Sequence, residues 1–329
     1  MKITYEKWGI HDGKSVYLYT LANNAGARVQ VTNYGATLVA VQLADGTHQV
    51  LGFDTLQAYL EDRAYMGSTV GPVANRIGAA RFTLDGHTYH LEANDGVNNN
   101  HSGSAGVHAK VFDKELPEDA LVLHYTMPNG DGGFPGNIQL TVYYQWDDNS
   151  MLRIRYEAVA DKAAVVNITN HAYFNLSGAH GNVQDHVLHI PASQVLETSA
   201  AYIPTGKVIP AQSKSFEAPQ LLRTGLNDYY ILDSKQPLKL AAILEHPASG
   251  HSLEVHTTYP GLMVYAADYL ASKAAGILGE PYAAFGGVCL ECQHYPDAPN
   301  HVTFPSITLK AGQRYQEQII YHFKNTMVR

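Results

Sequence analysis

Cysteine is scarce in this chain: 2 Cys occur among 329 residues. That is too few for the disulfide framework of small secreted domains, so we expect a reducing, cytoplasmic location. The formal net charge is −8, charged side chains make up 16% of the residues, and no run of four or more like charges occurs. A broad nucleic-acid surface needs clustered Lys and Arg. These absences therefore argue against a nucleic-acid partner.

Long apolar runs are also missing. No stretch approaches the ~18 residues that a membrane-spanning helix needs, so we expect no membrane partner. The first residues, MKITYEKWGIHDGKS, contain neither an apolar h-region nor a small-residue cleavage site, and we expect no signal peptide. Nor do we find a linker-like stretch, a composition shift or an internal repeat. We expect a single domain over residues 1–329, present as a monomer or a homodimer.

Tyrosine and histidine are abundant instead, with 22 Tyr and 17 His against 9 Phe. Both side chains suit strands that have one wet face. The sequence DDNS at 147–150 predicts a hairpin loop, and residues 54–61 predict a short helix with Asp54 as its N-cap. Alternating, β-branched segments predict antiparallel strands at 27–46 (strand, turn, strand), 120–127, 138–146, 151–160, 165–174, 186–192, 238–244, 252–258, 261–270, 287–295 and 316–323. The expected fold class is all-β, with two large antiparallel sheets packed face to face.

The sequence CLEC at 289–292 has the spacing of a redox pair or half a zinc site. In a strand, however, residues three apart point to opposite faces, so Cys289 and Cys292 lie on opposite sides of the sheet. We therefore disfavour both readings. The same alternation puts Glu291 on the face of Cys289 and Gln293. A carboxylate within an apolar strand is either a solvated edge residue or a functional group, and the apolar flanks raise the functional alternative.

The sequence NITNHAYFNLSG at 167–178 places His171 at the end of an apolar strand. A histidine there is a packed core residue, a metal ligand or a proton donor. Asn170 and Asn175 add hydrogen-bonding groups that an ordinary core strand avoids. The neighbours favour function but leave the three alternatives open.

Two loops offer further polar groups. In STVGPVANRIGAARF (68–82), Asn75 and Arg76 form either a structural turn or a guanidinium and an amide suited to vicinal hydroxyls. The Gly/Asn/Ser loop at 94–108 carries His101 and His108. Two His and one Glu are also the ligands of a common zinc site. We find no H-E-x-x-H and no close His pair beside a carboxylate, so a metal is not favoured.

Together these segments resemble the aldose 1-epimerase (galactose mutarotase) family over nearly the whole chain. The residues NHAYFNLSG match the family pattern N-H-x-Y-F-N-L-x-G, and LECQHYPDAPNHVTFPS matches its E-x-Q-x-x-P-D-A-x-N-x-x-x-F-P-S. The segments GPVANRIGAARF, NNNHSGSAGVH, NGDGGFPGN, YIPTG and TTYPGLMVY also fall into register. The first two motifs are long and specific.

The resemblance implies a single β-supersandwich domain, no cofactor, and interconversion of the α and β anomers of a free sugar such as galactose or glucose. By position, Glu291 resembles the general base of the family and His171 resembles its general acid. His101, Asn75 and Arg76 resemble its sugar-binding residues.

Several positions depart from the family pattern. Pro72 stands where Arg is common, and residues 100–103 replace Leu-His-Gly-Gly. Asn227 stands in the column of a sugar-binding Asp with Asp228 next to it, and either is a candidate contact. Met263 replaces a Gln. These changes leave the preferred sugar open, and they leave three alternatives: an epimerase for a disaccharide such as maltose, one for a sugar phosphate, or a sugar-binding or regulatory protein of the same fold.

Overall fold

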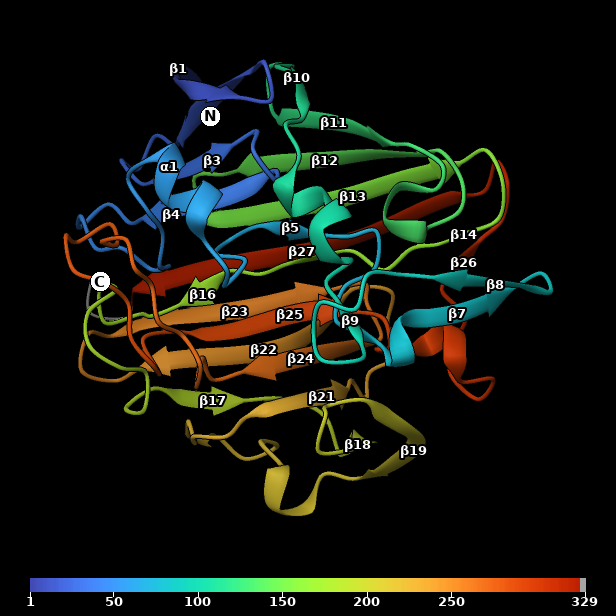
Figure 1. Ribbon diagram of the computed structural model, residues 1–329. Coiled ribbons are helices and arrows are strands. Elements are labelled where there is room, and N and C mark those ends of the chain that lie inside the picture. The colour runs from blue at the N-terminus through green and yellow to red at the C-terminus, as the bar shows by residue number, and fades with distance from the viewer. Residues whose placement is uncertain (326–329) are drawn as a thin grey trace.

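The computed structural model describes residues 1–325, and strands dominate it (Figure 1). The one α-helix in these residues, α1 (Leu56–Glu61), begins one residue later than expected. Its N-cap is Thr55, whose hydroxyl accepts a hydrogen bond from the Ala58 N–H, so the prediction of Asp54 as the cap is wrong. No helix in the described part of the chain is long and apolar enough to cross a membrane. Single 3-10 turns lie at Gly78–Ala80, Gly103–Ala105, Val107–Ala109, Asp131–Gly133, Gln212–Lys214 and Ala298–Asn300.

The largest sheet of the described residues has nine strands, all paired antiparallel. It confirms the strands expected at 120–127, 138–146 and 151–160 and the hairpin loop between the last two. The strands lie in the order β10 (Asp113–Glu115), β11 (Leu121–Met127), β12 (Ile138–Trp146), β13 (Met151–Ala160), β27 (Arg314–Asn325), β23 (His251–Thr257), β22 (Lys239–His246), β17 (Val187–His189) and β20 (Gln220–Leu221).

A six-stranded antiparallel sheet faces the nine-stranded sheet, and the four N-terminal strands form a third sheet. The six strands are β16 (Tyr173–Phe174), β25 (Val288–Gln293), β24 (Gly261–Tyr265), β21 (Asn227–Ile231), β18 (Gln194–Thr198) and β19 (Pro204–Pro210). The four are β1 (Lys2–His11), β2 (Lys14–Ala22), β3 (Arg28–Thr32) and β4 (Thr37–Gln42). Two-stranded ladders join β14 (Ala164–Val165) to β26 (Thr308–Leu309), β15 (Thr169–Asn170) to β5 (Thr69–Val70), β6 (Arg76–Ile77) to β9 (Asn99–Asn100), and β7 (Arg81–Leu84) to β8 (His87–His90).

The main core draws its residues from the nine-stranded, six-stranded and four-stranded sheets. Tyr321 of β27 and Phe174 of β16 are both fully buried, and their ring centroids are 4.9 Å apart across the two layers. Leu290 and Cys292 of β25 point into the same core. The alternate residues of β25 therefore point to the other face of the six-stranded sheet.

The segment 165–174 is not the single strand that its pattern predicts. It is divided into β14, β15 and β16, which pair with β26, β5 and β25 respectively. Between them the backbone N–H of Asn167 donates to Pro72 O, and that of His171 donates to Ser68 O. The strand is divided because successive parts of this segment pair with different strands that are distant in the sequence. His171 lies at the second break.

Candidate active site

The floor of the site is the outer face of the six-stranded sheet. Glu291 of β25 lies opposite Met263 of β24, and Cys289 lies opposite Tyr265. Tyr265 in turn lies opposite Asn227 of β21. Because side chains on paired strands share a face, these residues point to one side of the sheet.

The same register separates the two neighbouring candidates on β21. Asn227 lines the pocket on this face. Asp228 does not line the pocket, and it accepts a hydrogen bond of 2.6 Å from the Lys214 ammonium. Of the pair, the structure brings Asn227 to the site and leaves Asp228 in an ion pair on the other face.

A cavity of about 540 Å³ lies over this floor. Its volume falls in the range of small-molecule sites. Most residues that the sequence proposed for the site line this cavity: Glu291, His171, His101, Asn75, Arg76 and Asn227. His108 and Asp228 do not. Residues far apart in the sequence thus converge on one concave surface.

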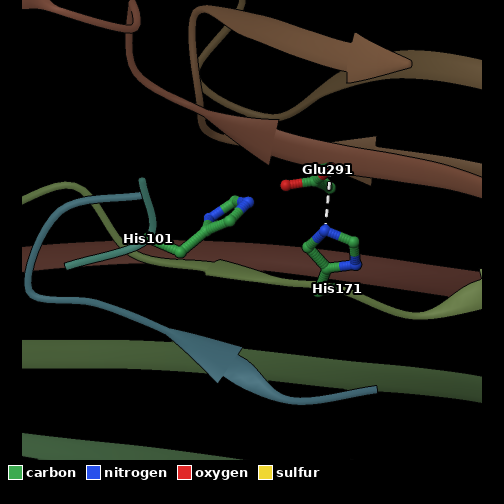
Figure 2. Close-up of side chains that lie close together, drawn as sticks. All are labelled: His101, His171 and Glu291. Carbon is green, nitrogen blue, oxygen red and sulfur yellow. Dashed lines mark ion pairs between the residues drawn. The ribbon is translucent and has the colours of Figure 1, made fainter. Parts of the chain in front are cut away.

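Glu291 and His171 meet at the buried end of the cavity. The carboxylate Oε1 lies 3.6 Å from the imidazole Nε2, and Figure 2 shows the two side chains approaching from opposite layers. Both side chains are buried. Glu291 Oε2 has no hydrogen-bond partner among the described residues. A buried carboxylate oxygen without a partner is costly and is available to a ligand hydroxyl.

Burial shifts the proton affinities of the pair in opposite directions. It raises the pKa of Glu291 to about 8, an effect that the Arg76 charge partly opposes. It lowers the pKa of His171 to about 4. Between about pH 4 and about pH 8 the pair holds one proton in total. It titrates as a unit because the two groups are in contact.

His101 is held in one tautomer. Its backbone N–H donates to Asn75 O, and its Nδ1 accepts a hydrogen bond of 3.1 Å from the Asn75 N–H. Burial also lowers the pKa of His101 well below its usual value, which favours the neutral ring. A neutral ring that accepts at Nδ1 carries its proton on Nε2. His101 therefore presents an N–H donor near Glu291 (Figure 2).

Arg76 is fixed from three sides. Its Nε donates to Asp95 at 2.7 Å, and its guanidinium lies 5.2 Å from the centroid of the Tyr202 ring. Its backbone carbonyl accepts a hydrogen bond from the N–H of Asp297, in the segment PDAPN of the C-terminal motif. The side chain of Asp297 also accepts from the Gly78 N–H. The motif therefore supports the Arg76 turn structurally.

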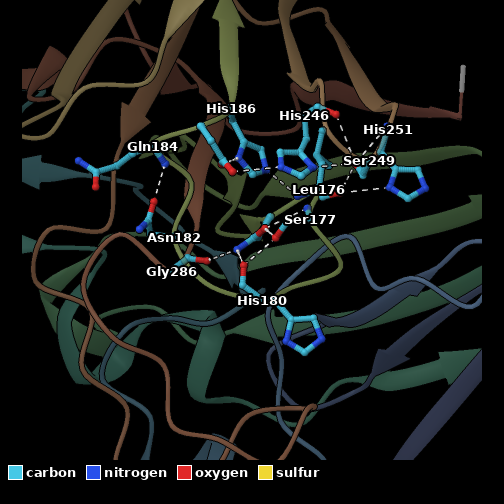
Figure 3. Close-up of polar contacts among 12 residues, drawn as sticks. Leu176, Ser177, His180, Asn182, Gln184, His186, His246, Ser249, His251 and Gly286 are labelled. Carbon is cyan, nitrogen blue, oxygen red and sulfur yellow. Dashed lines mark hydrogen bonds and ion pairs between the residues drawn. The ribbon is translucent and has the colours of Figure 1, made fainter. Parts of the chain in front are cut away.

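The asparagines around His171 are structural clamps. Asn170 Nδ2 donates to Gly67 O at 2.8 Å, and the Gly67 N–H donates to His171 O. Asn175 Nδ2 donates to Gly286 O at 2.8 Å, just before β25, and to His180 O, and Figure 3 labels these two acceptor residues. Both clamps tie the segment of His171 to neighbouring layers, which fixes the imidazole relative to Glu291.

Several residues that line the pocket were missed by sequence reasoning, among them Tyr65, Tyr202 and Tyr269. The ring of Tyr65 lies 4.7 Å from His101 and 5.8 Å from His171, centroid to centroid. His108, a loop candidate, packs behind Tyr65 at 4.8 Å and does not line the cavity. Of these three tyrosines, only Tyr202 had a signal, because it lies in the YIPTG segment.

A close pair of histidines beside a carboxylate does exist, contrary to the expectation from sequence. One possible ligand atom each from His101, His171 and Glu291 lies within 4.8 Å of the others. A metal needs a free nitrogen lone pair from each histidine. In His101, Nδ1 already accepts from Asn75 and Nε2 carries the proton of the neutral ring. The donor set therefore fits a hydrogen-bonded sugar better than a cation.

The two cysteines are both free and buried. Cys289 Sγ lies 3.6 Å from His171 Nδ1 on the site face. Cys292 belongs to the main core on the opposite face. The alternation predicted from CLEC is confirmed.

The chain matches proteins of one known family. The family model described as aldose 1-epimerase matches residues 17–322. The chain is 34% identical over 310 residues to galactose mutarotase from Rattus norvegicus, covering 90% of each protein. It is 33% identical over 334 residues to aldose 1-epimerase from Escherichia coli K12, covering 95% of this chain and 96% of that protein.

Solved structures agree. Galactose 1-epimerase from Lactobacillus acidophilus superposes with a TM-score of 0.87 at 29% identity, covering 98% of both chains. An aldose epimerase homologue from C. elegans superposes with a TM-score of 0.88 at 29% identity, covering 94% of this chain and 98% of that one. The all-β architecture expected from the sequence is confirmed.

Proposed function

The chain belongs to the aldose 1-epimerase family, and we propose that it interconverts the α and β anomers of free aldoses such as galactose or glucose. It is thus an isomerase, a mutarotase. The observation that carries the proposal is the buried Glu291–His171 pair at the closed end of the cavity, with an unpartnered carboxylate oxygen. Its two free, buried cysteines are in keeping with a reducing, cytoplasmic location.

Ring opening needs a base and an acid on different sides of the anomeric carbon. Glu291 takes the proton of the anomeric hydroxyl, C1–O1 becomes a carbonyl, and the C1–O5 bond breaks. The electron pair of that bond stays on O5, which takes the proton of His171 Nε2. The aldehyde rotates about C1–C2 and recloses with the two roles reversed. Every proton is returned, so neither a cofactor nor a covalent intermediate is needed.

The shared proton of the free site must lie on His171 when the sugar reacts. The raised pKa of Glu291 and the lowered pKa of His171 favour the proton on Glu291 in the free site. The opposite charges formed by its transfer to His171 lie 3.6 Å apart and attract each other. A sugar hydroxyl donated to Glu291 stabilises this reactive placement further.

Four further residues are proposed to bind the sugar. The Nε2–H of His101 donates to the ring oxygen or a hydroxyl. Asn75 Oδ1 accepts from the Arg76 N–H at 2.8 Å, which turns its amide nitrogen toward other partners. Arg76 and Asn227 supply donors to the remaining hydroxyls.

We expect kcat/KM to fall below about pH 4 and above about pH 8. Below the lower value both groups carry protons and no base remains, whereas above the upper value neither holds a proton to give. Polarimetry of fresh α-galactose between pH 3 and 10, corrected for the uncatalysed rate, measures the profile. A rate that stays level through pH 9.5 would contradict the one-proton pair.

The cavity favours a neutral sugar over a sugar phosphate. Its other charged lining residues nearly balance in sign, with Arg63, Arg76 and Lys273 set against Glu61 and Asp62, and the Glu291–His171 pair, which holds one proton, has no net charge. Phosphate recognition needs an excess of cationic donors. Met263 is apolar and lies across the strand pair from Glu291, so it offers the sugar no hydrogen bond of its own.

The proposed function is tested by the equilibration of fresh α-galactose, α-glucose, xylose and galactose 6-phosphate with the purified protein. We expect acceleration of neutral aldoses, and a kcat/KM for the phosphate that is no higher than for galactose. Binding of the neutral sugars without any acceleration would instead support the sugar-binding protein. A preference for the phosphate of tenfold or more would support the sugar-phosphate epimerase.

A further inference from the structure

Tyr65 lies against the histidines at the closed end of the cavity, yet the acid–base mechanism gives it no role. Its ring centroid lies 4.7 Å from that of His101, 4.8 Å from that of His108 and 5.8 Å from that of His171. Burial raises the pKa of the Tyr65 hydroxyl, so this group is neutral near pH 7 and is no base for the reaction. A side chain of this kind affects the reaction through the imidazoles that it covers.

The backbone of Tyr65 adopts a conformation that a bulky residue rarely takes. Its φ is 56°, in the left-handed region. The Asp62 carboxylate accepts hydrogen bonds from the N–H groups of Ala64 at 3.0 Å and Met66 at 2.7 Å, on either side of Tyr65. The Ser68 N–H donates to Tyr65 O at 3.0 Å. These bonds maintain a strained conformation, and strain of this kind occurs preferentially at functional sites.

The turn that carries Tyr65 is attached to the segment of His171. Ser68 O accepts a hydrogen bond of 2.9 Å from the His171 N–H. The Tyr173 hydroxyl, two residues further on, donates to Ala64 O at 2.9 Å. The ring of Tyr65 therefore keeps a fixed position relative to the imidazole of His171.

The Tyr65 ring covers imidazoles that are otherwise close to the cavity. Tyr65 is half-buried and lines the cavity, whereas His101 and His171 are 6% and 4% exposed. Burial is the largest cause of the lowered pKa of both histidines and of His108. Because these three rings are held neutral, the proton shared by His171 and Glu291 is the one that exchanges in the reaction.

Other ionisable groups surround the acid–base pair as well, and they come from separate segments: Asp62, Arg76, His101, His108, Tyr173 and Cys289. Burial raises the pKa values of Tyr173 and Cys289 well above their usual range, so both stay neutral. A substitution at Tyr65 replaces none of these groups. A change in the titration of His171 in such a variant therefore reports on its access to water.

We propose that Tyr65 is a positioning residue for the acid–base pair: its ring holds the imidazoles of His101 and His171 in place and keeps water from them. This inference rests on the proposed mutarotase activity and adds a residue to its mechanism. The ring provides the cover and the hydroxyl is dispensable.

The test compares the pH dependence of kcat/KM for galactose in the parent, Tyr65→Ala and Tyr65→Phe. Water admitted by Tyr65→Ala stabilises the imidazolium, so both groups of the pair stay protonated to a higher pH. We expect the acidic limb to rise from near pH 4 by about one pH unit, and kcat to fall about tenfold with KM changed less than about threefold. Tyr65→Phe keeps the ring and should match the parent.

Two further variants complete the series. Tyr65→Leu keeps an apolar side chain without the ring, and we expect a smaller shift of the acidic limb in the same direction. Tyr89→Ala is the matched control, because Tyr89 of β8 is also half-buried, packs on Phe82 and does not line the cavity. It should keep the profile of the parent.

Titration of the histidine ring signals by NMR tests the inference without turnover. The His171 signal is identified by its loss in His171→Gln, and its midpoint should rise in Tyr65→Ala and stay unchanged in Tyr65→Phe. A lower rate with an unmoved acidic limb and midpoint would make Tyr65 merely structural, and equal shifts in Tyr65→Phe would assign the effect to the hydroxyl. Either result overturns the inference. A parent that does not accelerate anomer exchange would instead overturn the proposed function, and the midpoints would still show whether Tyr65 covers His171.

Discussion

Glu291→Gln lowers kcat for galactose about 10³-fold and changes KM by no more than a few-fold. The amide keeps the size of the side chain and its contacts, but it cannot accept the anomeric proton. General acid–base catalysis is worth about 10²–10⁴ in rate, and Glu291 also balances the charge that develops on His171. Loss in kcat without loss in KM is the signature of a group that acts in the transition state. Initial rates by polarimetry, over a range of galactose concentrations, measure both constants.

The stability of this variant provides an internal control for folding. The pKa of Glu291 is raised to about 8 in the folded protein, so its ionisation destabilises the fold progressively as pH rises from about 4.5 to about 8. Removing the carboxyl removes that penalty. We therefore expect Glu291→Gln to unfold at a higher temperature than the parent at pH 8.5 and at a similar temperature at pH 4.5. Glu245→Gln, an exposed glutamate on β22, should match the parent in rate.

His171→Gln lowers kcat about 10²–10³-fold. The amide nitrogen of Gln lies near the position of Nε2 and still donates a hydrogen bond, but it does not transfer its proton to the ring oxygen. Without the imidazole, Glu291 must ionise alone to act as the base, so the acidic limb of the residual rate should move from near pH 4 toward the raised pKa of Glu291. Initial rates between pH 3 and 10 test both expectations.

The control for this variant is His87→Gln, which changes an exposed histidine on β8 in the same way. Near-parent activity in His171→Gln, with the acidic limb of the profile intact, would remove His171 from the mechanism. Equal losses in both variants would point to a general effect of histidine replacement.

The all-β fold was predictable because strand alternation is a local signal. It located β16, β24 and β25 of the six-stranded sheet and all but β10 and β20 of the nine-stranded sheet, but it missed β18, β19 and β21. It also placed Glu291 on the face opposite Cys292. The breaks at Asn167 and His171 were not predictable, because their backbone N–H groups bond to Pro72 O and Ser68 O respectively, about a hundred residues away in the chain. The N-cap of α1 is Thr55 and not Asp54, and because both residue types cap helices well, the sequence pattern alone does not distinguish them.

The residues of the site were also only partly predictable from the sequence. The resemblance named the residues that line the cavity, yet the residues alone did not show that Glu291, His171 and His101 meet. Their contact depends on which layers the loops cross. Choosing Asn227 over Asp228 required the pairing of β21 with β24. Tyr65 and Tyr269 lie outside the motifs, so no sequence signal marked them.

One measurement tests the central claim most directly: the rate of exchange between α- and β-galactose at equilibrium, by NMR, with the parent and Glu291→Gln each saturated with sugar. Saturation removes differences in affinity, so the rate reports the acid–base pair alone. The account predicts fast exchange with the parent and near-background exchange with the variant. Equal exchange in the two proteins would contradict the assignment of Glu291, and bound sugar without exchange in the parent would contradict the mutarotase activity.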